Sequence, residues 1–126
     1  MSRWAGASLV ALSLAGCGGL RAVTKTITVL PPNAVRVSPP RNLRGAARSE
    51  FLAGRAAVAR SGCLACHMIG SDGNPGPGPN LTSVGSRLDQ RQLLESLRSP
   101  RPPMPSFAQL PREQLIDVVR FLRDLR

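Results

Sequence analysis

Two cysteines separated by two residues, with a histidine directly after the second, constrain this chain more than any other feature. They are Cys63, Cys66 and His67, in a sequence of 126 residues that contains no other histidine. A Cys-x-x-Cys-His segment is typical of covalent haem attachment, because two thiols at this spacing reach both vinyl groups along one porphyrin edge. The imidazole that follows is then placed under the iron as an axial ligand. The segment predicts one covalent haem c, attached through Cys63 and Cys66 and ligated by His67.

Three other kinds of site use the same residue types. A structural zinc site needs four ligands, but His67 is the only histidine, and the third cysteine, Cys17, is assigned below to an anchor. A thioredoxin-like thiol pair requires a βαβ setting, and no strong strand pattern flanks Cys63. A disulfide between Cys63 and Cys66 would leave His67 without a role. Haem attachment is the interpretation that uses all three residues.

The second axial ligand has one candidate. Met1 leaves with the signal segment, Met68 adjoins His67 on the wrong side of the ring, and Met104 remains. Met104 stands among three prolines in residues 101–107, and prolines stiffen a loop by fixing φ and removing backbone donors. A stiff loop suits a weak thioether ligand. We expect Met104 to be the second axial ligand, and the alternative is a gap-filling methionine near the surface.

Residues 54–126 resemble a small class I cytochrome c, a family of monohaem electron carriers. Besides the haem segment, residues 76–81 read Gly-Pro-Gly-Pro-Asn-Leu and are similar to the Gly-Pro-x-Leu loop of that family. The resemblance implies that the backbone carbonyl of Pro79 accepts a hydrogen bond from the ring N–H of His67. It also implies an all-α fold in which three to four helices wrap around one covalent haem.

The same resemblance implies roles for three further residues. Arg87 corresponds to an arginine near a haem propionate in many members of the family. Gly54 is expected where the first and last helices cross, so that the backbone of one approaches Phe121 of the other.

The chain departs from the family pattern in several respects. Val58 falls near where relatives often place an aromatic, and the gap that follows it to Cys63 is a little longer than in some relatives. The chain has no Tyr, and its only Trp is Trp4, so the aromatic donors that hold the propionates in the best-known members are absent.

Local patterns predict three helices. Residues 49–61 are rich in alanine and are followed by Gly62, a common helix stop. Residues 89–99 open with an Asp-x-x-Gln capping box and end before a proline. A last helix begins with Pro111 in its first turn. Apolar residues recur at helical spacing along it and are expected in the core: Leu115, Val118, Val119, Leu122 and Leu125.

The chain begins with a short apolar segment that is typical of a secretory signal. Residues 1–16 carry Arg3 and then an apolar stretch, which is too short to span a membrane because that takes about 20 residues. Residues 14–17 read Leu-Ala-Gly-Cys and resemble the lipobox of bacterial lipoproteins. The resemblance implies cleavage before Cys17 and lipidation of its thiol, and two or more acyl chains anchor a protein firmly. The alternative is an ordinary cleaved signal that leaves Cys17 as a stray thiol.

Residues 17–44 are expected to form a basic, proline-rich tether. They contain five Lys or Arg, no acidic residue, two Pro-Pro pairs and no helical period. Positive charge beside a lipid anchor is attracted to anionic headgroups. Residues 23–29 alternate like a strand and offer a segment for pairing with a partner's sheet, although an extended tether explains them as well. The folded domain is predicted to cover residues 45–126.

Charge and ligation together favour electron transfer. The formal charge of +10 is not accompanied by the stacking aromatics that nucleic-acid binding uses. His67 and Met104 close both axial positions of the iron, so no small-molecule substrate is expected. We expect a lipid-anchored monohaem cytochrome that passes single electrons between membrane-bound respiratory donors and acceptors and is not itself an enzyme. It would work at the extracytoplasmic face of the bacterial membrane, on the periplasmic side or the outer surface.

Two alternatives remain open. The domain could be a fixed haem-binding subunit of a larger oxidoreductase complex that never shuttles. If Met104 is not an axial ligand, the chain could be a ligand-binding haem sensor or enzyme, and carbon monoxide or cyanide would then bind at mild pH without unfolding the protein.

Overall fold

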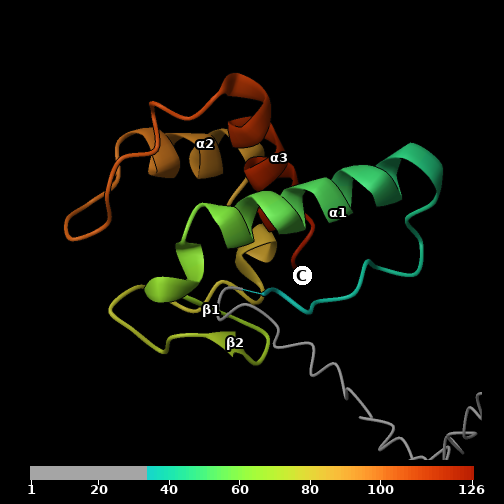
Figure 1. Ribbon diagram of the computed structural model, residues 1–126, viewed down its shortest axis with the longest axis horizontal. Helices are drawn as coiled ribbons and strands as arrows, with labels where there is room; N and C mark the ends of the chain where they lie inside the picture. The colour runs from blue at the N-terminus through green and yellow to red at the C-terminus, as the bar shows by residue number, and fades with distance from the viewer. Residues whose placement is uncertain (1–33) are drawn as a thin grey trace, which may run out of the picture.

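The structure is a computed structural model that describes residues 34–126 (Figure 1). The signal segment, Cys17 and the alternating residues 23–29 lie outside the described residues. In chain order the elements are α1 (Gly45–Arg60), a 3-10 turn (Cys63–Ala65), β1 (Met68–Ile69), β2 (Asp72–Gly73), a second 3-10 turn (Val84–Ser86), α2 (Gln90–Arg98) and α3 (Arg112–Arg123). The prediction of a small all-α fold is confirmed, with one short strand pair in the described part.

The helix ends follow the local signals in the sequence. Asp89 caps α2: its side chain accepts from the backbone N–H of Gln92, and the Gln92 side chain accepts from the backbone N–H of Asp89. Gly62 follows α1 in the left-handed region with φ of 74°, as its position after the helix predicts. Helix α1 begins four residues before the predicted start. The prediction missed this first turn because its residues are exposed and carry no apolar pattern.

Helices α1 and α3 pack across each other and form most of the core (Figure 1). The expected crossing is confirmed: a Cβ at Gly54 would lie 2.6 Å from the Cβ of Phe121 and would overlap the backbone of Asp117. Next to this point the rings of Phe51 and Phe121 lie with centroids 4.8 Å apart at an interplanar angle of 57°. Each buried phenylalanine contributes about 1.5–3 kcal/mol through apolar burial. The five predicted core residues of the last helix are all buried: Leu115, Val118, Val119, Leu122 and Leu125.

Residues 34–44 pack on the domain, although they belong to the segment predicted to form the tether. Val35 is 7% exposed, and Arg36 forms an ion pair with Asp72. The carbonyl of Val37 accepts a hydrogen bond from the guanidinium of Arg55, at 3.0 Å. The folded unit therefore begins before residue 45. Residues 34–44 are called the strap below. The strap has no helical period because it is extended and is held by contacts with distant residues.

A short hairpin follows the Cys-x-x-Cys-His segment and was not predicted. Strands β1 and β2 pair antiparallel, with Met68 opposite Gly73 and Ile69 opposite Asp72. Gly70 in the connecting turn has φ of 62°, a conformation that glycine adopts without steric cost. With two residues in each strand, the hairpin is too short for an alternating apolar pattern to reveal it. Its importance lies in its position, directly after His67.

No helix among residues 34–126 has the length and apolar character needed to cross a membrane.

Candidate functional site

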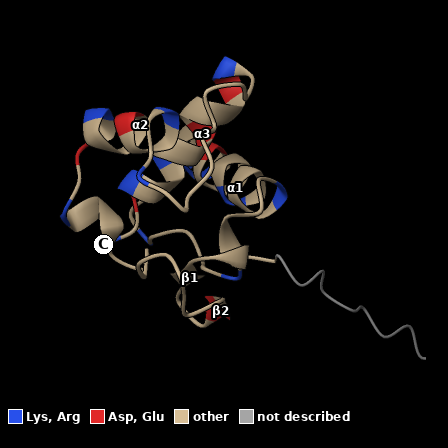
Figure 2. Cartoon of the chain, turned by 90° about the vertical axis from the view of Figure 1, so that its left-hand side faces the viewer, with Lys and Arg blue, Asp and Glu red and all other residues tan. Residues whose placement is uncertain are grey.

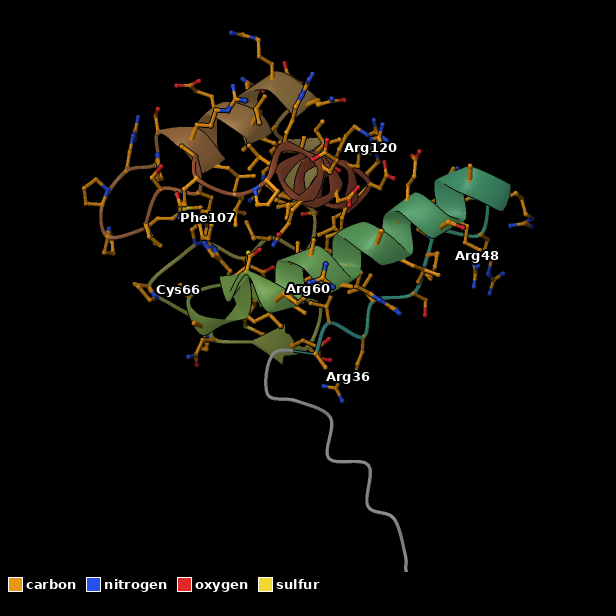
Figure 3. All side chains as sticks on the ribbon, turned by 45° about the horizontal axis from the view of Figure 1, so that its top comes forward. Arg36, Arg48, Arg60, Cys66, Phe107 and Arg120 are labelled. Atoms are coloured by element: carbon orange, nitrogen blue, oxygen red, sulfur yellow. The ribbon has the colours of Figure 1, made fainter. Side chains whose placement is uncertain are left out.

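A cavity of about 700 Å³ opens at one end of the domain. Its walls are mostly apolar and come from four places: the Cys63–Ala65 turn, the loop of residues 77–79, the end of α2 and the loop of residues 99–107. Figure 3 shows Cys66 and Phe107 at this end of the molecule, with Arg48 at the opposite end of α1. Because α1 ends just before Cys63, this helix delivers the cysteine pair to the cavity.

His67 is buried at the floor of this cavity with an exposed fraction of 7%. Its Nδ1 lies 2.7 Å from the backbone carbonyl oxygen of Pro79, and a carbonyl can only accept, so the ring N–H at Nδ1 donates. The neighbouring Gly78 lies so close to the imidazole that a Cβ there would overlap the ring. The N–H of Gly78 in turn donates to the carbonyl of Cys66 at 2.7 Å. The resulting tautomer leaves Nε2 as the ring nitrogen with a free lone pair.

The two cysteines of the segment line the cavity, and no disulfide joins them. Burial is the main cause that raises the pKa of the Cys63 thiol to about 11. Thioredoxin-like cysteines have lowered pKa values and react as thiolates, so the environment of Cys63 argues against that alternative. Within residues 34–126 no group of three or more His, Cys, Asp or Glu side chains could hold a metal ion. Structural zinc therefore has no ligand set in this part of the chain.

Met104 lines the same cavity as His67 and is partly buried against the core. The loop that carries it is bonded back to α2: the N–H of Phe107 donates to the carbonyl of Leu97 at 2.8 Å, and the hydroxyl of Ser106 donates to the carbonyl of Arg98 at 2.7 Å. The structure thus brings the two candidate axial ligands to one cavity from loops 37 positions apart in the sequence.

Arg87 does not line the cavity. Its side chain is exposed and donates to the carbonyl of Asn80 at 2.9 Å, beside a separate shallow groove. In this position it braces the loop that holds Pro79. Among the described residues that line the cavity, Arg101 is the only Lys or Arg. The sequence prediction missed Arg101, because the family resemblance points to Arg87 instead. The place of Arg101 three residues before Met104 was the available signal.

The cavity fits a covalently attached haem in size and chemistry. Its volume falls within the range of about 300–1,000 Å³ that is usual for cofactor pockets. The apolar walls suit a macrocycle, while Ser96, Ser99 and Arg101 provide polar groups on the α2 side. Gly78 leaves room at the imidazole that any larger residue would fill. Cys63 and Cys66 line the site together with this imidazole, which is the donor set that thioether attachment and iron ligation require.

A comparison with protein families supports the same assignment. The family model described as cytochrome C oxidase, cbb3-type, subunit III matches residues 50–122, more than half of the chain. The match spans all three helices apart from the first five residues of α1 and the last residue of α3, and it includes both candidate axial ligands. Comparisons with curated proteins and with solved structures gave no match.

Proposed function

The chain belongs to the family of cytochrome c oxidase, cbb3-type, subunit III, and we propose that it is a membrane-anchored, monohaem electron carrier of a respiratory chain. Membership makes it a c-type cytochrome that carries covalently bound haem c and transfers electrons. The observation that carries the proposal is the shared cavity of His67 and Met104. Two protein ligands would leave the iron no open position for a substrate.

Each residue of the cavity has a part in this proposal. Bound haem supplies an iron that alternates between the ferric and ferrous states. Cys63 and Cys66 would hold it by thioether bonds, and His67 and Met104 would ligate its iron. Pro79 orients the His67 ring through the 2.7 Å hydrogen bond. A ligand held in this way keeps its position in both oxidation states, so little rearrangement accompanies each transfer.

The proposed place of work is the extracytoplasmic face of the bacterial membrane. The lipobox-like residues 14–17 and the basic residues after them support lipidation of Cys17. Figure 2 shows basic residues, all of them Arg, on all three helices of the domain, with fewer acidic residues between them. This surface suits docking of an acidic redox partner, because opposite charge steers encounters.

The first test is the visible spectrum of the purified, haem-loaded protein, with Met104→Ala and Met68→Leu as variants. We expect the unmutated protein and Met68→Leu to show the weak far-red band of a methionine–ferric iron bond. Met104→Ala should keep its covalent haem, lose the band and bind carbon monoxide at neutral pH. Carbon monoxide binding by the unmutated protein at mild pH would instead favour a sensor or enzyme.

The second test concerns the anchor. Cys17→Ser should release the mature protein from membranes, whereas Ser38→Ala should not, since Ser38 lies 21 positions after Cys17 and outside the lipobox. Membrane extraction and detection of acyl chains by mass spectrometry give the answer. A Cys17→Ser protein that stays acylated and membrane-bound would contradict the proposal.

The family description names a subunit of an oxidase, so a fixed place in such a complex is the second candidate function. Mild detergent extraction separates the two. A free carrier migrates alone, at the size of the mature chain that begins at Cys17, while a fixed subunit migrates with its complex. The cavity residues would have the same roles in either case.

A further inference from the structure

Arg36 and Asp72 form a clasp between the strap and the hairpin. The backbone N–H of Arg36 donates to Oδ2 of Asp72 at 2.6 Å, and its Nε donates to Oδ1 at 2.6 Å. A second guanidinium nitrogen lies 2.5 Å from Oδ1. The carboxylate is 5% exposed, whereas the arginine side chain is 62% exposed. Both oxygens of a buried carboxylate are therefore satisfied by one residue from outside the Cys-x-x-Cys-His region.

The strap is fixed on both sides of Arg36. Val35 is buried in the core. The carbonyl of Val37 accepts from Arg55 of α1 at 3.0 Å, and a methyl group of Val37 lies 3.5 Å from the Cβ position of Gly70. Because these contacts fix the chain on both sides of Arg36, this residue cannot move along with the hairpin. The clasp can therefore hold the hairpin in place. Figure 3 labels Arg36 on the strap near the hairpin.

The hairpin is in direct contact with the backbone of His67. Strand β1 begins at the next residue, and a Cβ at Gly73 of β2 would overlap the carbonyl oxygen of His67. On the other side, the N–H of Leu81 donates to the carbonyl of Met68 at 2.8 Å. The loop that presents the Pro79 carbonyl is thus bonded to β1, and Asp72 lies opposite Ile69 in the same hairpin.

We propose that Arg36 is a positioning residue for His67: by holding Asp72 it fixes the hairpin, and through the hairpin the alignment of the His67 ring with the Pro79 carbonyl. The inference rests on the proposed role of His67 as an axial ligand. The hydrogen bond on the second ring nitrogen of a ligating histidine sets its tautomer and its strength as a ligand. On this proposal Arg36, which lies 31 positions before His67, helps to orient the proposed ligand of the haem iron.

Amide hydrogen exchange of the full-length, haem-loaded protein in detergent tests the proposal. In Arg36→Gln, exchange at the amides of Gly78 and Leu81 should speed up by about tenfold more than exchange at Val118 and Val119 in α3, whose slow amides report only the loss of overall stability. Arg36→Lys keeps the charge but not the forked geometry, and it should fall between. Asp72→Asn should give the same pattern as Arg36→Gln.

A matched control separates positioning from general stability. Phe51→Leu removes core packing between α1 and α3 and should speed exchange at all slow amides by a common factor. If Arg36→Gln gives that uniform pattern, or leaves Gly78 and Leu81 unchanged, Arg36 only contributes to stability and the proposal is overturned. The double variant with Asp72→Asn should resemble each single one, because the two residues act through one contact.

The reduction potential provides an independent readout. A purely electrostatic effect would shift the potential down in Arg36→Gln, which loses a positive charge, and up in Asp72→Asn, which loses a negative one. A looser His67–Pro79 bond weakens donation from the imidazole to the iron and raises the potential in both. Shifts in the same upward direction support the proposal, and shifts in opposite directions contradict it. The spectrum of the unmutated protein tests the proposed function separately, since hydrogen exchange is read whether or not Met104 is a ligand.

Discussion

Nδ1 of His67 donates a hydrogen bond to the carbonyl oxygen of Pro79 across a distance of 2.7 Å. This bond fixes the proton on Nδ1, so Nε2 is the nitrogen that is free to bind a metal. The surrounding backbone supports this bond: the N–H of Gly78 donates to the carbonyl of Cys66, and that of Leu81 to the carbonyl of Met68. The chain therefore presents an oriented imidazole to the cavity.

Gly78 should be intolerant of a methyl group. A Cβ there would overlap the His67 ring, whereas a Cβ at Gly76 meets nothing within 4 Å. We expect Gly78→Ala to displace the ring or the Pro79 loop and to weaken or abolish the far-red methionine–iron band. Gly76→Ala should keep the band. Visible spectra of the two purified proteins check this, and equal bands would mean that the loop gives way easily.

Gly54 should be equally sensitive, for a reason of packing. Its Cβ would overlap α3 at Asp117 and Phe121, and forcing atoms into a packed core costs about 1–3 kcal/mol or more. Gly54→Val should lower the free energy of unfolding and the haem yield. Ala59→Val, on the same helix but only partly buried, is expected to lower both less. Urea unfolding followed by circular dichroism measures the difference, and equal losses would speak against a tight crossing.

Arg101 is expected to influence the haem propionates, because it is the only Lys or Arg among the described residues that line the cavity. A neighbouring positive charge lowers the pKa of a carboxyl group by about 1–3 units. Arg101→Gln should raise the propionate pKa, so the fall of the reduction potential with pH should move to higher pH by about 1 unit. Arg87→Gln is the control, since Arg87 bonds to Asn80 outside the cavity. If only Arg87→Gln shifts the pH dependence of the reduction potential, Arg87 is the residue near the propionate, as the family resemblance implies.

Asp72 should make stability depend on acid pH. Burial acts to raise the pKa of its carboxyl group, but the two hydrogen bonds and the charge of Arg36 prevail and hold that pKa below the ordinary value of 3.8. A carboxyl group with a lowered pKa in the folded state stabilises the fold above its unfolded pKa, and this contribution is lost as pH falls through the folded value.

Asp72→Asn should therefore unfold more easily than the unmutated protein at pH 7, by about 1–3 kcal/mol. The difference should shrink below about pH 4. Asp124→Asn is the control and should change the unfolding free energy by less than about 1 kcal/mol, because Asp124 pairs with Arg123 near the surface. Urea titrations between pH 3 and 7 give the comparison. A constant difference across that range would show that the Asp72 charge is not involved.

Local signals in the sequence were sufficient for the helices. The Asp89 and Gln92 cap involves residues three apart, and the left-handed Gly62 depends on its own backbone. The haem attachment segment likewise spans only five residues, from Cys63 to His67, so its spacing alone indicates its chemistry. Such features are predictable because the partners are close in the chain. The Gly54 crossing and the Pro79 hydrogen bond connect distant residues, and only the family resemblance made them predictable.

Tertiary structure decided which distant residues meet. No local pattern marks Arg36 as the partner of Asp72, 36 positions later, because the ion pair exists only once the strap lies against the hairpin. The same applies to Arg101, which lines the cavity because its loop is bonded back to α2, while Arg87 turns to Asn80. The sequence by itself determined the haem attachment segment and the helices, through short-range geometry. The folded chain determined which side chains surround His67, since burial and charge pairing depend on the arrangement of all the elements.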